Sequence, residues 1–431
     1  MHRLTVENFG PIKERIVFEP KDFSIIIGEQ ASGKSIIAKL VFLFRSLRDD
    51  IMKWMYEESD RLSKANINRV IRDKFLKFFG RNKPLPSGFY MKYEYSDGIY
   101  IELTSRKEDG LLWSKLSNGF VKKFNGIINH RRKISEEIKR IKEKKIEFLT
   151  SAELYQLEEE ERRLLRPIEE QINTLFNDSY IPIYIPAGRA VLNFLEEVEI
   201  ENMDFLMSMF IKRVVSSKRK FSESLESLIE SEKGHPADEE RVRLLYKVAG
   251  LVYKILKAEY RYEKGKEFLL LQQESEKIPL QFASSGQQEV LWILLLLFQI
   301  MLENRKVFLV IEEPEAHLFP TAQTLLIEYI SAFLNLTKSH VLITTHSPYI
   351  LSFINVLLLR AKANINYPFL IPMKKIGAWY RNLHEFTSII DAETKLIKDN
   401  AIDDVSETIA EELEELEEAI YGEKAQSSNN Q

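Results

Sequence analysis

The stretch "FSIIIGEQASGKSIIAKLVFLF", residues 23–44, joins an apolar strand pattern to a helical pattern through a glycine-containing loop. The loop, residues 28–35, fits the spacing G-x-x-x-x-G-K-[ST]. Gly28 and Gly33 let the backbone wrap closely around phosphate oxygens, and the helix start supplies positive potential. Lys34 would reach the outer phosphates, and Ser35 would offer its hydroxyl to Mg²⁺. The alternative, a flexible glycine turn, is disfavoured because strand, loop and helix follow in the required order.

Composition excludes several classes of protein. The chain has 431 residues, 45% hydrophobic and 29% charged, which is enough for two or three folded domains. It contains no cysteine, which excludes disulfides and thiolate metal sites and fits a cytoplasmic location. The net charge of −4 gives no global attraction to nucleic acid.

The apolar run 290–302 is too short to span a bilayer, so we expect a buried helix and no membrane partner. The first ten residues alternate like a strand and do not resemble a cleavable signal.

A second strand pattern ends in acids. The segment "VFLVIEEPE", residues 307–315, is apolar until it reaches two adjacent carboxylates. In a parallel sheet the carboxyl ends of the strands meet at one edge, so these acids would lie beside the phosphate loop. Glu312 would hold Mg²⁺ through water, and Glu313 would orient or deprotonate an attacking water. Without the phosphate loop, an ordinary strand end with solvated acids would be the better interpretation.

A third strand pattern, "VLITTHSPYIL" at 341–351, reaches a histidine at its carboxyl end. A neutral imidazole of His346 could bond the γ-phosphate and respond to its loss. A single histidine at a strand end is more often structural. Here it follows the glycine loop and the two acids along the chain, and this order favours a role in the nucleotide site.

A serine-rich segment, "FASSGQQEVL" at 282–291, precedes a long apolar helix. One interpretation is a simple N-cap, because a serine hydroxyl satisfies N–H groups at a helix start. The other is an anion seat, because small residues at a positively polarised helix start can bind phosphate.

The order and spacing of these motifs resemble the ABC-type ATPase head, in the branch that contains the SMC, RecF and OLD proteins. "IEEPEAHLFP" and "TTHSPYIL" are especially similar to bacterial phage-defence ATPases of the Septu and PARIS type. The resemblance covers about 1–50 and 180–350. It implies an α/β fold: an ABC-ATPase head with a mixed, largely parallel sheet, a helical subdomain and an inserted antiparallel coiled-coil hairpin.

The resemblance also implies site residues and partners. The cofactors would be ATP and Mg²⁺, with Ser35 and Glu312 as metal ligands and Glu313 and His346 as catalytic residues. The serine-rich segment would be the signature motif, which closes on the γ-phosphate of a second subunit, and "EAHL" (315–318) would be the D-loop at the same interface. The expected nucleotide-binding residues are Gly28, Glu29, Gln30, Ala31, Ser32, Gly33, Lys34 and Ser35 in one chain, with Ser284, Ser285, Gly286 and Gln287 from its partner.

Two features depart from the family pattern. The first acid after the strand is Glu312, where Asp is usual, which changes its reach by one methylene. The usual Q-loop glutamine cannot be placed, and the corresponding strand is "IYIPAGR". Its Gly188 and Arg189 either approach the nucleotide or form a structural turn, and the sequence leaves both open.

The predicted organisation has four parts: 1–50, an N-terminal ATPase lobe; 51–179, an insertion; 180–350, a C-terminal ATPase lobe; and 351–431, a mixed segment with an acidic helix and a tail. The insertion should contain a strand hairpin that turns at 96–98 and a helical hairpin within 130–176. The first arm of the helical hairpin is basic and the second opens acidic, which favours their pairing. Residues 399–423 carry eleven Asp or Glu and no Lys or Arg.

Three functions compete. The leading one is an ATPase that dimerises on ATP and acts as a sensor or scaffold in anti-phage defence. It would control a separately encoded effector, expected to be a nuclease. Assembly beyond the dimer is left open by the sequence. The second is a RecF-like DNA-repair ATPase, favoured by the basic run 106–145, which offers a phosphate track. The third, an ABC transporter subunit, is disfavoured by the helical hairpin and by the form of "EEPEAHL".

Overall fold

The computed structural model describes residues 2–57, 64–80, 86–106, 111–144, 151–194, 203–232, 239–271, 276–371, 375–398 and 410–414. A six-stranded sheet lies at the centre, in the order β14-β13-β3-β12-β11-β7. All neighbouring strands are parallel except β13 and β14. The strands are β3 (Phe23–Gly28), β7 (Ile181–Ile185), β11 (Val307–Glu312), β12 (His340–Thr345), β13 (Ile376–Arg381) and β14 (Phe386–Ser388). The predicted mixed, largely parallel sheet is confirmed.

Both faces of this sheet are covered, so its middle strands are apolar on both sides. Alternate residues point to two separate cores: Ile25 and Ile27 of β3 face one, and Ile26 faces the other. Successive side chains of a strand point to opposite faces, which explains why the apolar runs in the sequence are continuous rather than alternating.

One core lies between the six-stranded sheet and a five-stranded antiparallel sheet, in the order β2-β1-β4-β5-β6. The helix that follows the loop at 28–35, α1, is buried there along most of its length. The predicted turn at 96–98 is confirmed between β4 and β5. The elements of this part are β1 (Arg3–Glu7), β2 (Ile16–Phe18), α1 (Lys34–Glu57), α2 (Lys64–Phe79), β4 (Tyr90–Ser96), β5 (Ile99–Ser105) and β6 (Leu112–Leu116).

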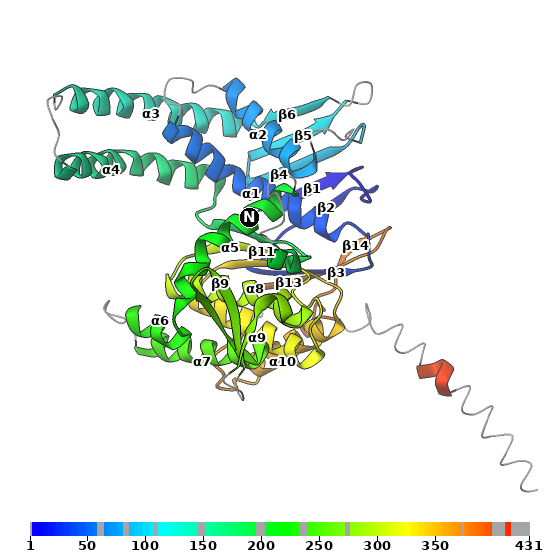
Figure 1. Ribbon diagram of the computed structural model, residues 1–431. Helices are drawn as coiled ribbons and strands as arrows, with labels where there is room; N and C mark the ends of the chain where they lie inside the picture. Colours follow the sequence, from blue (N-terminus) through cyan, green and yellow to red (C-terminus); the bar gives the residue numbers. More distant parts are fainter. Residues whose placement is uncertain are drawn as a thin grey trace, which may run out of the picture.

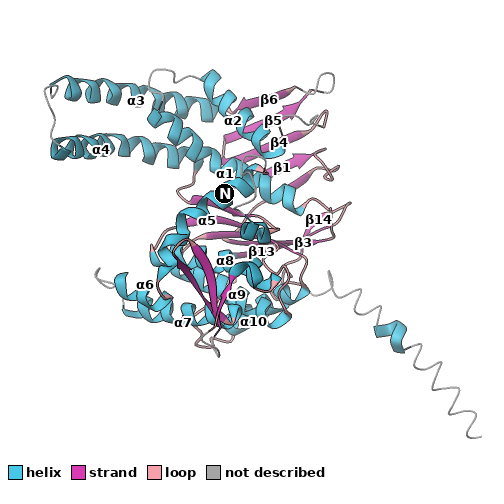
Figure 2. Ribbon diagram, viewed as in Figure 1, coloured by secondary structure: helices cyan, strands magenta, loops and turns pink. Residues whose placement is uncertain are grey.

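The other core lies on the opposite face of the six-stranded sheet, where α8 and α9 pack (Figure 2). By length and composition α8 could cross a membrane, but 72% of its apolar window is buried inside the protein, as expected for a core helix. The elements of this part are α5 (Phe205–Lys218), α6 (Leu225–Glu232), α7 (Glu239–Leu256), β8 (Ala258–Glu263), β9 (Lys266–Leu271), β10 (Lys277–Pro279), α8 (Ser285–Leu302), α9 (Pro320–Thr337) and α10 (Pro348–Lys362).

Two long helices, α3 (Asn118–Lys144) and α4 (Ser151–Phe176), run side by side and project from the body (Figure 1). They form the predicted helical hairpin, although its first arm begins earlier than the heptad pattern indicated. Lys142 of α3 and Glu161 of α4 form an ion pair at 2.5 Å, as expected from the opposite charges of the arms. The predicted acidic helix over 399–423 lies largely outside the described residues, and only 410–414 are described, as helix.

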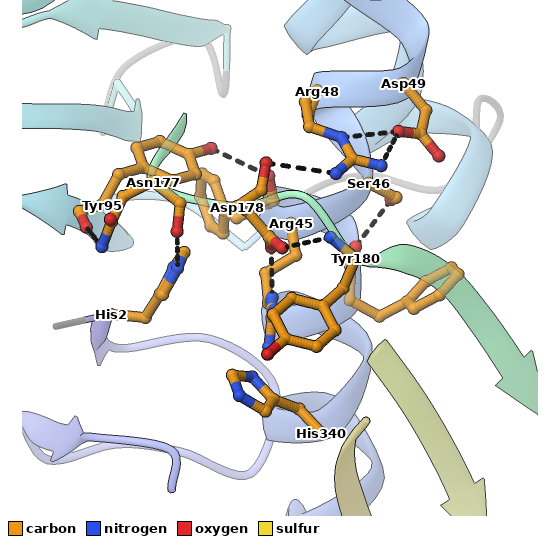
Figure 3. A network of polar contacts seen from close by, with 12 residues as sticks. His2, Arg45, Ser46, Arg48, Asp49, Tyr95, Asn177, Asp178, Tyr180 and His340 are labelled. Carbon is orange, nitrogen blue, oxygen red and sulfur yellow. Dashed lines mark hydrogen bonds and ion pairs between the residues drawn. The ribbon is translucent and has the colours of Figure 1, made fainter. Parts of the chain in front are cut away.

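A buried polar network fixes the base of the hairpin to α1 (Figure 3). Just after α4, the carboxylate of Asp178 accepts from Nε of Arg45 in α1 at 2.6 Å, and its carbonyl accepts from Nη1 of Arg48 at 3.1 Å. Tyr180 stacks on His340 with 4.1 Å between ring centroids. Burial lowers the pKa of His340 to about 4, so the stacked ring is neutral at pH 7. The network joins the end of the hairpin to the helix that begins at the phosphate loop.

Candidate functional site

The sheet order brings the three predicted strand ends together. Strand β12 lies between β3 and β11, with Thr345 opposite Ile27 and Glu312 opposite Thr344. Because these strands are parallel and in register, Gly28, Glu313 and His346 emerge at one edge of the sheet. This register places Glu312 and Glu313 near the loop at 28–35, as the sequence predicted.

The loop between β3 and α1 has positive φ angles at both of its glycines, a conformation that favours glycine. Gly28 has φ +149° and Gly33 has φ +101°, and Ala31 is left-handed at φ +59°. The hydroxyl of Ser32 donates to the carbonyl of Glu29 at 2.8 Å, which holds the loop in a closed turn. Gln30 lies in the exposed part of this loop, between Glu29 and Ala31.

Lys34 is buried at the first position of α1 and folds back over the loop. Its Nζ donates to the carbonyl of Gly28 at 2.8 Å and to that of Glu29 at 2.5 Å. Burial lowers the pKa of Lys34 to about 8, although Glu313, Glu315 and Glu29 act in the opposite direction. The ammonium is therefore desolvated and held where an anion would be a stronger partner than two neutral carbonyls.

Glu312 and Ser35 present oxygen ligands suited to Mg²⁺. The Glu312 side chain is buried, its Oε2 accepts weakly from the N–H of Ala187 at 3.4 Å, and its Oε1 is buried without a partner. An unpaired buried carboxylate oxygen is costly unless a cation occupies the site. Ser35, half-buried at the start of α1, adds a hydroxyl. Hard oxygen donors of this kind fit Mg²⁺. When bound with the nucleotide, the metal would neutralise charge on the phosphates.

Glu313 and His346 come together beyond the strand ends. Nε2 of His346 lies 3.5 Å from Oε1 of Glu313, and both side chains are more than a third exposed. Glu313 has a left-handed backbone with φ +43°, uncommon for a residue with a side chain, and its N–H donates to the carbonyl of Thr344 at 2.8 Å. Such conformations persist where the surroundings enforce them, often at functional sites. The carboxylate is accessible to water and close to a second titratable group.

Of the two alternatives that the sequence left open for Arg189, the contacts of its side chain favour the structural one. The side chain is fully buried. Its guanidinium donates to the carbonyls of Glu289 and Glu312 at 2.9 and 2.8 Å, and to that of Glu313 at 2.9 Å. Arg189 therefore braces the backbone that carries both acids, and Gly188 belongs to a structural turn. Each of the three guanidinium nitrogens donates to a backbone carbonyl, so the group is held inside its own chain.

The serine-rich segment proves to be both a cap and an exposed helix start. Ser284 caps α8 and shares a capping box with Gln287. Ser284 and Ser285 are exposed. The Gln287 side chain is engaged within its own chain: its amide donates to the carbonyl of Leu256 at 2.7 Å and accepts from the N–H of Ser284 at 3.1 Å. Its contact with a nucleotide bound by a partner stays a prediction.

Gly286 is needed for close packing against the segment 315–318. A Cβ at Gly286 would lie 2.6 Å from the carbonyl oxygen of His317, which no side chain permits. The start of α8 and this segment are therefore adjacent, as the resemblance implies. Large apolar side chains beside them are exposed: Phe282 by 72% and Phe319 by 74%.

Glu315 belongs to the same site as Glu313, whereas the D-loop interpretation assigned it to the partner interface. Its Oε1 accepts from Oγ1 of Thr345 at 2.6 Å and from the N–H of His346 at 2.8 Å. Its Oε2 is buried without a partner. Sequence reasoning missed this role, although the third acid in "EEPE" was a signal for it. Glu315 therefore fixes the backbone at Thr345 and His346.

A family model described as "AAA ATPase domain" matches residues 1–351. The match includes the loop, both acids and His346, and it spans most of the chain. This protein belongs to that family. It is an ATPase, as the sequence motifs predict, and the family implies a bound nucleotide. A comparison with curated proteins finds no match.

Among solved structures, three SMC heads align over most of their length. One is an SMC head bound to the C-winged helix domain of ScpA, with TM-score 0.41, 12% identity, and coverage of 91% of this chain and 97% of that chain. The head domain from Thermotoga maritima has TM-score 0.35, 13% identity and coverage of 88% and 93%. The head with an extended coiled coil from Pyrococcus furiosus, bound to the C-terminal domain of ScpA, has TM-score 0.37, 12% identity and coverage of 90% and 96%.

Proposed function

We propose that this ATPase is an ABC-type head that dimerises on ATP and acts as the sensor or scaffold of a defence system, controlling a separately encoded nuclease. The observation that carries the dimer is the exposed start of α8, Ser284 and Ser285, in contact with the segment 315–318 and flanked by exposed Phe282 and Phe319. The helix start suits the phosphates of a bound nucleotide. The exposed apolar side chains beside it suit the surface of a second copy of the chain.

The chemistry assigned to each residue follows from the site. Residues 28–35 wrap the phosphates, with Lys34 leaving its loop carbonyls for the outer phosphates. Glu312 and Ser35 hold Mg²⁺. Glu313 accepts a proton from the attacking water or orients it, and His346, 3.5 Å away, contacts the γ-phosphate and responds when it leaves. Ser284 and Ser285 of the second copy close the site.

Ser284→Arg is expected to keep the monomer fold and ATP binding but to block dimerisation on ATP, because the long side chain fills the partner's phosphate position. Light scattering with ATP and Mg²⁺, in a variant that cannot hydrolyse ATP, measures the dimer. The matched control is Ser224→Arg, which removes the hydroxyl that bonds the N–H of Ser227 at the start of α6. Both variants lose a cap worth about 1 kcal/mol, so their melting temperatures should fall equally. Equal dimerisation of the two variants would contradict the signature role.

The defence role is supported by the resemblance of "IEEPEAHLFP" and "TTHSPYIL" to phage-defence ATPases. We expect the locus, expressed with its neighbouring genes in a bacterial host, to protect against at least one phage of a diverse panel. Protection should disappear with Lys34→Ala, while Lys39→Ala, one helical turn further along α1, should retain it. Protection that is unchanged by Lys34→Ala would contradict ATP control of the effector. Neighbouring replication genes without protection would favour DNA repair.

A DNA-repair role has one supporting observation, the basic outer surface of α3. Exposed cations follow this helix, namely Lys122, Lys123, Arg132, Lys133, Lys139 and Arg140. Spaced cations on a long helix can follow a phosphate backbone, and binding of this kind weakens steeply with salt. DNA affinity with a steep salt dependence, lost when three of these cations are neutralised, would favour this second function.

A further inference from the structure

The strand beside the phosphate loop comes from the C-terminal segment, beyond residue 351 where the family match ends. Strand β13 pairs with β3 in parallel, and its last residue, Arg381, lies opposite Gly28. The carbonyl oxygen of Arg381 accepts from the N–H of Glu29 at 3.1 Å. A Cβ on Gly28 would lie 1.8 Å from that oxygen, so glycine is required there by contact with β13.

The Arg381 side chain reaches the same loop. It is fully buried. Its Nε donates to the carbonyl of Ser32 at 2.9 Å, and its Nη1 donates to the carbonyl of Glu385 at 3.1 Å. Its Nη2 is buried and has no hydrogen-bond partner. Among the described residues, no carboxylate forms an ion pair with this guanidinium, although Glu14 acts on it from a distance.

A buried cation without a counter-ion is unfavourable unless an anion lies nearby. Arginine cannot escape this cost by releasing its proton, because its pKa stays far above neutral even when burial lowers it, as here. Among the described residues, Glu14 acts on this guanidinium only from a distance, whereas the phosphate chain that the loop is proposed to bind would bring an anion to the same loop. The position of Arg381 therefore suits a protein whose resting state contains a nucleotide.

The contact to Ser32 explains how the charge would act. The carbonyl of Ser32 and the N–H of Gly33 belong to one planar trans peptide, so they point in opposite directions. A cation on the carbonyl side polarises that peptide and strengthens the N–H as a donor on the other side. The N–H groups of such loops face the phosphates.

We propose that Arg381 is a positioning residue for ATP, which holds and polarises the Ser32–Gly33 peptide from outside the phosphate loop. The C-terminal segment is thereby part of the nucleotide site. This inference rests on the assignment of residues 28–35 as the phosphate loop, and it adds a requirement from a segment that the family match does not include.

The test is competition against a fluorescent ATP analogue by three unlabelled ligands: ATP, pyrophosphate and adenosine. Arg381→Gln is expected to weaken ATP and pyrophosphate by about tenfold or more, the effect of losing one charge-assisted hydrogen bond, and to leave adenosine unchanged. Arg381→Lys keeps the charge beside Ser32 and should retain ATP affinity to within about threefold of the wild type. Trp379→Phe, on the same strand, is the matched control and should leave all three ligands unchanged.

A merely structural role would give a different pattern. If Arg381→Gln weakens adenosine as much as ATP, or if Arg381→Lys binds ATP as poorly as Arg381→Gln, the residue only supports the fold and the proposal fails. It fails equally if both variants unfold, or if Arg381→Gln binds ATP normally. Lys34→Ala, measured alongside, tests the phosphate-loop assignment separately from the role of Arg381. Normal ATP binding in Lys34→Ala overturns the loop assignment. A defect in Lys34→Ala with none in Arg381→Gln overturns the inference about Arg381 alone.

Discussion

Lys34→Ala is expected to abolish tight ATP binding. The ammonium is the one side-chain cation that the loop directs to the outer phosphates, and here it is buried and bonded to loop carbonyls that phosphate oxygens would replace. A hydrogen bond to a charged group contributes about 1.5–3 kcal/mol, and several such bonds are lost together. A loss of about a thousandfold in affinity is therefore expected, measured by titration with a fluorescent ATP analogue.

The matched control is Lys39→Ala, because Lys39 is half-buried on the same helix but one turn beyond the loop. It should bind ATP like the wild type. Unchanged affinity in Lys34→Ala would contradict the phosphate-loop assignment and, with it, the placement of the whole site.

The lowered pKa of Lys34 gives this affinity a pH dependence. In the free protein the pKa is about 8, and bound phosphates would raise it, because they favour the charged form. Binding above pH 8 therefore requires proton uptake, so wild-type affinity should fall between pH 8 and 9.5, in a window that Lys34→Ala does not show.

Glu313→Gln is expected to keep ATP binding and to reduce hydrolysis by about a hundredfold to ten-thousandfold, the usual contribution of a general base. The amide has nearly the size of the carboxylate but cannot accept the proton of water. Since ATP then remains bound, the variant should accumulate as a dimer in the presence of ATP and Mg²⁺. Phosphate release and light scattering on one sample measure both effects.

Glu159→Gln, on the exposed side of α4, makes the same chemical change away from the site and should hydrolyse ATP normally. If Glu313→Gln hydrolyses ATP at close to the wild-type rate, Glu313 is not the catalytic acid. Glu315, whose second oxygen is buried and unpaired, would be the next candidate.

The sequence predicted the site well where one motif fixes one local structure. Residues 23–44 contain the strand, the loop and the helix start in a single run, and the acids and His346 each follow an apolar strand pattern. Parallel pairing then brings these strand ends to one edge, so local patterns were enough to predict their proximity.

The parts that sequence reasoning missed depend on contacts between distant segments. Arg189 and Glu289 are a hundred positions apart, and Arg381 contacts Ser32 across 349 positions. Periodicity carries no information about such pairs. It also cannot distinguish a buried arginine that braces a backbone from one that faces a phosphate. The hydrogen bond of Gln287 could not be predicted for a similar reason, because its partner, the carbonyl of Leu256, lies at the end of a different helix.

The central claim, that each ATP site is shared between two copies, is tested most directly by mixing Lys34→Ala with Ser284→Arg and measuring ATP hydrolysis. In a mixed head-to-tail dimer, one composite site carries both defects and the other carries neither. Each variant alone should be inactive, and the mixture should recover up to about a quarter of wild-type activity, since random pairing makes half the dimers mixed with one intact site each. No recovery, with mixed dimers demonstrated by differential labelling, would contradict the claim.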